Sequence, residues 1–262
     1  METTGIAYKS LRLIDGKIVS DYDHSEWIIG VWRTNPYPVV EACKGLNCCE
    51  FIIDTMKYVS GEIIAQVEYK GKTIIRPDKI TAQDMRIIKS WKWNAFITTS
   101  IAYYAASLVE DNYTNMFPTD YRLKSCNKTI SRYISDPSPV STAELFSAWE
   151  TTCSVVRESD PVWEEATDHV ANSARWAARS TLWAMKAAKL SANIPVWWAT
   201  GSTDQPELSF HIQPMVSAVN SSIVSAEWAS PLSERAAGQG IKLKIQTRLE
   251  SYLENYCETI DE

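Results

Sequence analysis

The sequence is short of glycine and histidine, the residues that mark many nucleotide and metal sites. Only nine glycines and three histidines occur among 262 residues. None of the glycines falls in a G-x-G-x-x-G or G-x-x-x-x-G-K arrangement, whose backbone N–H groups bind phosphate. The chain also lacks the G-x-S-x-G nucleophile elbow and the H-E-x-x-H zinc motif. These absences argue against the common nucleotide-binding enzymes, serine hydrolases and zinc proteases, and we expect no cofactor and no metal.

Cysteine is present, but not in the arrangement of a disulfide framework or a metal site. The six cysteines include no Cys-x-x-Cys pair, and the adjacent Cys48 and Cys49 lie in an apolar stretch, where small buried thiols are common. Residues 1–14 lack the basic and apolar segments of a secretion signal, and no apolar stretch is long enough to span a bilayer. We therefore expect a protein of the reducing cytoplasm with no membrane partner.

Neither sign of charge is in large excess. The net charge is −6, with 22% charged and 45% hydrophobic residues, a balance typical of globular proteins that bury a core. A modest negative charge gives no support for the basic surface that binds nucleic acid. The composition therefore indicates a folded globular protein and argues against nucleic acid as its partner.

The first third of the chain alternates between β-like runs and turn residues. The predicted strands are residues 6–13, 17–20, 26–33, 62–69, 72–76 and 85–93. Asp15-Gly16 and Lys70-Gly71 are predicted to form the tight turns between paired strands. One helix is predicted to begin at Asn47, a potential N-cap that Glu50 follows three residues later. These patterns predict an α+β domain over residues 1–93, with a small, mostly antiparallel sheet and one packed helix.

The remainder of the chain, residues 94–262, is predicted to be an all-helical domain. The predicted helices cover residues 95–110, 141–158, 161–190, 214–228, 231–237 and 241–256. Residues 111–140 are rich in Asn, Thr, Ser, Asp and Pro, a composition that favours a long loop or linker.

Tryptophan is in surplus, with eleven in the chain. Trp176 and Trp183 are seven residues apart and would share one face of a helix, whereas Trp197 and Trp198 are adjacent in a segment interrupted by proline and glycine. Large aromatic residues fill cores between helices. They are also enriched among the residues that dominate protein–protein interfaces. Both interpretations remain open from the pattern alone.

Four short motifs follow one another in the first 93 residues. They are Gly45-Leu46-Asn47-Cys48, Tyr58-Val59-x-Gly61-Glu62, Val67-Glu68-x-x-Gly71 and Asp78-Lys79-Ile80-x-Ala82. This set resembles a domain of unknown function that is common in tailed bacteriophages and some bacteria. Members of that family show Gly-Leu-His-Ala where this chain has Gly45-Leu46-Asn47-Cys48, and carry Ala/Arg/Trp-rich helical tails similar to Ser173 to Ala188. The resemblance implies a phage or prophage origin and no known activity, and Asn47 replaces the family histidine.

A second, looser similarity concerns the order of the predicted strands. A Tyr-containing first strand, a Gly-Leu turn and a Val-Glu strand are similar to the layout of ADP-ribosyltransferase-like folds. That similarity would make Lys9 or Arg12, together with Glu62 or Glu68, candidates for a dinucleotide pocket. The alternative is that these residues are the ordinary polar face of strands with alternating side chains.

Two functions follow as hypotheses. The first is a non-enzymatic, phage-encoded protein of the host cytoplasm that binds another protein of host or phage, in host-factor modulation or in virion assembly. Its expected partner-binding residues are Trp176, Trp183, Trp197 and Trp198. The second is a nucleotide-binding or ADP-ribosyltransferase-like enzyme in the N-terminal domain.

Overall fold

A computed structural model describes residues 3–42, 44–59, 61–163, 169–192, 208–230 and 233–260 of the chain. The described residues divide into two compact units. The first unit contains residues 3–94, 208–209 and 250–260, and the second contains the rest. Residues 250–260, which the sequence assigned to the helical domain, therefore belong to the unit that holds the sheet.

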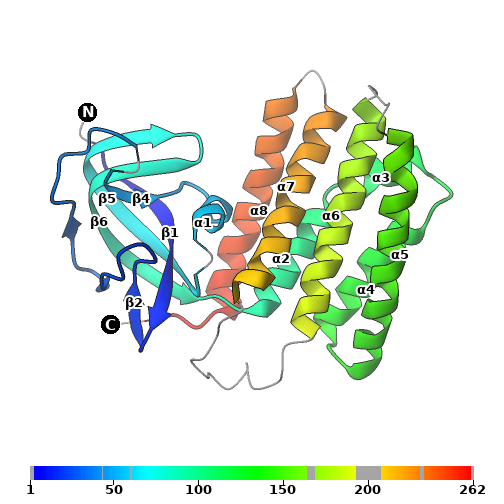
Figure 1. The fold of residues 1–262 in the computed structure, drawn as a ribbon, viewed down its shortest axis with the longest axis horizontal. Helices are drawn as coiled ribbons and strands as arrows, with labels where there is room; N and C mark the ends of the chain where they lie inside the picture. The colour runs from blue at the N-terminus through cyan, green and yellow to red at the C-terminus, as the bar shows by residue number, and fades with distance from the viewer. Residues whose placement is uncertain are drawn as a thin grey trace. The chain divides into compact units, whose positions relative to one another are not determined.

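The first unit is built on a six-stranded sheet (Figure 1). Its strands are β1 (Gly5–Ile14), β2 (Lys17–Val19), β3 (Arg33–Thr34), β4 (Leu46–Cys48), β5 (Ile63–Arg76) and β6 (Lys79–Lys92). The strand order is β2-β1-β5-β6-β3, and β4 also pairs with β6. All pairs of named strands are antiparallel, which confirms the predicted α+β fold with a mostly antiparallel sheet.

Two of the predicted strand boundaries are wrong, one in the β5–β6 hairpin and one before β3. Lys70-Gly71 is not a turn between two strands, because β5 continues through it to Arg76. Gly71 has a φ of 82° and lies at a shift in the register between β5 and β6. A glycine with positive φ can occupy a β-bulge as well as a turn, and here it lies at a bulge within a continuous strand. The predicted strand 26–33 is also interrupted, since Gly30 has a φ of 77° and only Arg33–Thr34 pairs as β3.

The segment around β4 corrects the predicted start of the helix. Asn47 lies inside β4, which pairs with residues 80–82 of β6, and does not cap a helix. Cys49, two residues after Asn47, exchanges two backbone hydrogen bonds of 2.8 Å with Tyr8 of β1. The segment therefore joins both β6 and β1, and this long-range pairing overrides the local capping pattern. The single helix of this region is α1 (Ile52–Tyr58), which packs on β1 and buries Ile52, Ile53 and Met56.

The second unit is helical, as predicted (Figure 1). The helices are α2 (Ala95–Ser107), α3 (Glu110–Met116), α4 (Arg122–Ser135), α5 (Pro139–Trp163), α6 (His169–Ala192), α7 (Leu208–Ala229) and α8 (Glu234–Tyr256). The last residues of α8, from Glu250 on, belong to the first unit. In the described ranges, no helix has both the length and the hydropathy that a bilayer crossing requires.

The loop predicted at 111–140 is wrong. Most of that stretch forms α3 and α4, and α4 buries Leu123, Cys126 and Ile130 at helical spacing. The polar composition that suggested a loop belongs to the exposed face of an amphipathic helix. The predicted break between helices 231–237 and 241–256 is also wrong, because Gly238 and Gly240 lie inside α8 without interrupting it. Each glycine costs a helix about 1 kcal/mol, less than the packing of a buried helix face supplies.

Candidate functional site

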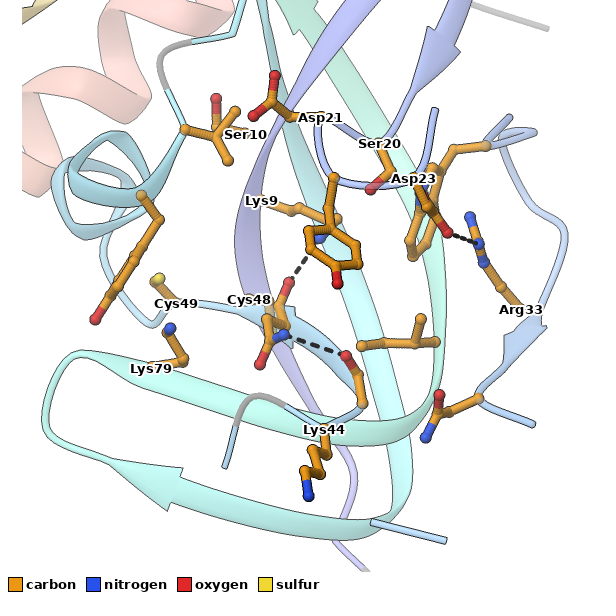
Figure 2. A pocket seen from close by; sticks show the side chains of 18 of the residues that line it. Lys9, Ser10, Ser20, Asp21, Asp23, Arg33, Lys44, Cys48, Cys49 and Lys79 are labelled. Carbon is orange, nitrogen blue, oxygen red and sulfur yellow. Dashed lines mark hydrogen bonds and ion pairs between the residues drawn. The ribbon is translucent and has the colours of Figure 1, made fainter. Parts of the chain in front are cut away.

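A cavity with a volume of about 900 Å³ opens on the first unit. Its wall is formed by residues 8–10 of β1, the loop 20–23 after β2, Trp27, parts of 33–40, residues 44–49, residues of α1 with Val59, and Lys79. Figure 2 shows Lys9 on the wall, between the loop that carries Asp21 and the segment that carries Cys48. The cavity is large enough for a small organic ligand.

Lys9 occupies a position in β1 where the alternation of side chains calls for an apolar residue. Ala7 and Leu11, two residues away on either side, belong to the hydrophobic core of the unit. Across the sheet, Lys9 lies opposite Ala65 of β5, which is also in that core. Lysine is among the residues least often placed in such surroundings. A cation on the core face of a strand is therefore a feature that folding alone does not explain.

The ammonium group of Lys9 has few polar neighbours. Its Nζ donates to the backbone oxygen of Asn47 at 2.9 Å and lies 5.3 Å from the centre of the Trp27 ring. Among the described residues, no carboxylate lies within ion-pairing distance of it. Burial is the largest influence on Lys9 and lowers its pKa below the usual value of lysine.

Arg33 approaches the same indole and places a second cation in the wall. Its guanidinium carbon lies 5.0 Å from the centre of the Trp27 ring, and its Nη2 pairs with Asp23 Oδ2 at 3.1 Å. The Trp27 Nε1 and the Arg33 Nη1 are buried and have no hydrogen-bond partner in the described part of the chain. Most buried donors in proteins are paired, and both of these unpaired donors belong to residues that line the cavity.

Asp23 remains charged in this setting. Burial raises its pKa, but hydrogen bonds from Ser25 and Ser20 and the charge of Arg33 lower it more, to about 2. The Ser25 hydroxyl donates to Asp23 Oδ1 at 2.5 Å, and the Ser25 N–H donates to the same oxygen at 3.2 Å. Asp23 thus holds Arg33 in place beside Trp27.

The two described thiols of the cavity are poor nucleophiles. Cys48 and Cys49 are 2% and 4% exposed. Burial raises the pKa of each thiol to about 12, against the weaker opposing effect of nearby lysines. Since the thiolate is the reactive form, both groups are unreactive near neutral pH.

The rim of the cavity carries aromatic rings and further positive charge. Tyr22 and Tyr37 are 96% and 75% exposed, and their rings are therefore accessible to a ligand. Lys79 lies 3.7 Å from the centre of the Tyr58 ring, and Lys44 pairs with Glu41 at 3.2 Å. The rim therefore combines exposed aromatic rings with positively charged side chains.

Of the residues proposed for a dinucleotide pocket, only Lys9 lines the cavity. Arg12 pairs with Asp21 at 3.2 Å and lies 4.0 Å from Glu62, while Glu68 pairs with Arg86 at 2.6 Å. Sequence reasoning missed Trp27 and Arg33. The one signal available was the interruption of the apolar face Ala7-x-Lys9-x-Leu11 by a lysine.

The predicted partner-binding tryptophans are only partly described. Trp176 and Trp183 are half-buried on α6, and each ring is approached by a cation three residues later. Arg179 lies 5.0 Å from the Trp176 ring, and Lys186 lies 4.9 Å from the Trp183 ring. Trp197 and Trp198 lie outside the described residues, and the role proposed for all four remains a prediction.

A search of the described residues for three or more His, Cys, Asp or Glu side chains able to hold a metal found no such group. Comparison of the chain with protein-family models, with curated proteins and with solved structures found no match. The resemblance to a phage domain therefore stays a prediction from the motifs, and the cavity around Lys9 has to be interpreted from its own chemistry.

Proposed function

We propose that the first unit binds a small organic anion with a flat ring, of the nucleotide class, in the cavity around Lys9. The observation that carries this proposal is the position of Lys9 on the core face of β1, without a carboxylate partner among the described residues. Proteins that bury polar groups at a cost in stability often use those groups for binding. An anionic ligand would supply the missing counter-charge.

The other features of the wall support the same class of ligand. Arg33 adds positive charge, and its Nη1 and the Trp27 Nε1 have no acceptor among the described residues, which phosphate or carboxylate oxygens would provide. Tyr22 and Tyr37 offer exposed rings on which a flat group can stack. The function of this unit would then be recognition of a metabolite or nucleotide.

The experiment compares two lysine variants by calorimetric titration with AMP, ADP, NAD and inorganic phosphate. Lys9→Met removes the charge and keeps the length of the side chain, so the affinity for the best ligand should fall about 10- to 100-fold, since a charge-assisted hydrogen bond contributes about 1.5–3 kcal/mol. Lys72→Met is the matched control, because Lys72 is an exposed residue of β5 that does not line the cavity. The control should bind like the wild type.

A purely structural role for Lys9 makes the opposite prediction. If Lys9 serves only to hold β4 through the Asn47 oxygen, Lys9→Met should lower the melting temperature and leave ligand affinity unchanged. If it serves the ligand, the variant should be at least as stable as the wild type, because methionine suits an apolar face better than a buried ammonium. Thermal unfolding of both variants without ligand distinguishes the two roles.

A protein-binding role for the second unit is the second candidate. The observation that favours it is the repeated Trp-then-cation arrangement of Trp176 with Arg179 and Trp183 with Lys186 on α6. Trp and Arg are enriched among the residues that dominate interfaces. With a partner captured from host lysate, Trp176→Ala should cost at least about 2 kcal/mol of binding, measured by biolayer interferometry. The control is Tyr121→Ala, an exposed aromatic residue of the same unit, and an affinity that Trp176→Ala leaves unchanged would contradict this placement.

A further inference from the structure

The neutral form of Lys9 has a reaction open to it that simple anion binding does not use. We infer that Lys9 forms a reversible imine with the carbonyl group of an aldehyde or ketone ligand in the cavity. This inference rests on the proposed ligand site and narrows its ligand to an anionic carbonyl compound. Three features of the described residues carry it, namely the surroundings of the amine, its hydrogen bond to Asn47 and the low reactivity of the other nucleophiles in the cavity wall.

The surroundings of the amine favour its neutral form. Ala7, Leu11 and Ala65 around its position belong to the core, and no carboxylate of the described ranges is within ion-pairing distance of it. Arg33 shares the Trp27 ring with Lys9 and adds a second positive charge nearby. Burial lowers the pKa of Lys9, and Arg33 lowers it further, against the opposing effects of Cys48, Cys49 and Asp23. Lysines that act through an imine are activated in this way.

The hydrogen bond to Asn47 orients the amine. A neutral amine has two N–H groups and one lone pair, and Lys9 gives one N–H to the Asn47 oxygen at 2.9 Å. Because the nitrogen is tetrahedral, its lone pair then points away from that oxygen. Since Lys9 lines the cavity, a carbonyl carbon bound there could approach the nitrogen.

The other nucleophiles of the cavity do not compete. The Cys48 and Cys49 thiols stay protonated, because burial raises the pKa of each to about 12. The Tyr58 hydroxyl donates to Asp78 Oδ2 at 2.5 Å, and this bond raises the pKa of the phenol. Lys79 lies against the ring of Tyr58 and Lys44 pairs with Glu41, so Lys9 is the amine with the most apolar surroundings among them.

The chemistry balances without an oxidant or a reductant. The lone pair of Lys9 Nζ attacks the carbonyl carbon, a C–N bond forms, and a proton moves from nitrogen to the former carbonyl oxygen. The remaining N–H proton of this carbinolamine then moves to the hydroxyl oxygen as the C–O bond breaks, so that water leaves and a C=N bond remains. One amine and one carbonyl group thus give one imine and one water, and hydrolysis reverses the sequence. Arg33 would hold the ligand's phosphate or carboxylate.

The test uses pyridoxal 5′-phosphate as a probe, since it combines a flat ring, a phosphate and an aldehyde. The full-length chain is incubated with less than one equivalent of the probe near neutral pH, the imine is reduced with sodium cyanoborohydride, and peptides are mapped by mass spectrometry. We expect Lys9 to be modified at least tenfold faster than the exposed Lys72 and Lys17. Modification of Lys9 at the same rate as these two lysines, or more slowly, overturns the inference.

A second arm separates the failure of this inference from the failure of the proposed function. Pyridoxine 5′-phosphate has an alcohol in place of the aldehyde and cannot form an imine, so its binding reports the anion site alone. If it binds the wild type and pyridoxal 5′-phosphate does not label Lys9, the imine is wrong and the anion site stands. If neither occurs, both proposals fail for this ligand. Lys9→Arg should bind the alcohol and lose labelling at position 9, because guanidinium keeps the charge and is not nucleophilic.

Discussion

The two units of this protein differ in the side chains that fill their interiors and in the polar groups placed among them. In the second unit, several hydroxyls between helices are paired: Ser180 Oγ donates to the Ala218 oxygen at 3.0 Å, and Ser222 Oγ donates to the Ala105 oxygen at 2.7 Å. In the first unit, Lys9 faces an apolar core with one carbonyl as its partner, and the Trp27 Nε1 has none that is described. Among the described residues, unpaired buried polar atoms occur in both units, for example at Trp27 in the first and at Ser100 in the second, so the lysine on an apolar strand face is what distinguishes the first unit.

The helices of the second unit approach one another through small residues. Eleven residues of α6 are buried, and all but one of them are Ala, Ser or Thr. Such residues let helix backbones come close, and their short hydroxyls can reach a carbonyl of the neighbouring helix. The sheet of the first unit is instead filled by large branched side chains such as Leu11, Ile63 and Ile87. Burying a polar group in such a core without a hydrogen bond costs free energy.

The largest effect is expected in the sheet core, from a pair of neighbouring isoleucines. Ile87 is fully buried and the next residue, Ile88, is 38% exposed, because side chains alternate along β6. Ile87→Ala should lower the free energy of unfolding by about 2–5 kcal/mol, whereas Ile88→Ala should lower it by clearly less. Urea denaturation measures both. Equal losses would show that the core does not lie on the assigned face of the sheet.

A smaller effect is expected from a paired hydroxyl in the second unit. Ser222→Ala removes the donor to the Ala105 oxygen and should cost about 0.5–1.5 kcal/mol, the usual net contribution of one hydrogen bond. The same change at the exposed Ser251 of α8 should be close to neutral. If both variants unfold at the same urea concentration as the wild type, the Ser222 hydrogen bond makes no measurable contribution to stability.

The smallest effect is a dependence of stability on pH at the cavity wall. The pKa of Asp23 is about 2 in the folded protein and about 3.9 in an unfolded chain, so the charged carboxylate favours folding above pH 4. This contribution should disappear as the pH falls through about 2, and it should be well under 1 kcal/mol because Asp23 is 45% exposed. The measurement is thermal unfolding of Asp23→Asn and wild type between pH 2 and 6.

The control for the pH experiment is Asp15→Asn in the first turn. Asp15 is exposed and has a φ of 50°, a backbone conformation that asparagine accepts. The stability difference between wild type and Asp23→Asn should shrink with acid, and at pH 6 it should exceed the difference caused by Asp15→Asn, because Asp23 pairs with Arg33. A difference for Asp23 that grows as the pH falls would have the wrong sign and would contradict its pairing with Arg33.

Much of the fold could be predicted, and the reasons are local. The Asp15-Gly16 turn and the alternating residues of β1 and β5 predicted the sheet, and the apolar period of α8 predicted a helix there. The errors arose where the same sequence pattern is compatible with two different local structures. A glycine with positive φ marks both a turn and a bulge at Gly71, and polar residues around Leu123 and Ile130 fit both a loop and the outer face of a helix.

Less of the candidate site could be predicted. Lys9 was a candidate through a resemblance of strand order, and its place between Ala7 and Leu11 is visible in the sequence. Trp27 and Arg33 carried no signal, because nothing in their neighbourhood differs from an ordinary β-like run. They reach Lys9 through backbone contacts of distant segments, such as the bond from the Trp27 N–H to the Ile18 oxygen at 2.8 Å.

The amino-acid sequence by itself determined which face of each strand and helix is apolar, because side-chain periods of two and 3.6 residues follow from the backbone alone. Only the tertiary structure decided that a lysine on such a face borders a cavity. That outcome depends on the pairing of Cys49 with Tyr8 and on the contacts of Arg33 and Trp27, which belong to other segments. Contacts between residues far apart in the chain do not produce a periodic pattern in the sequence.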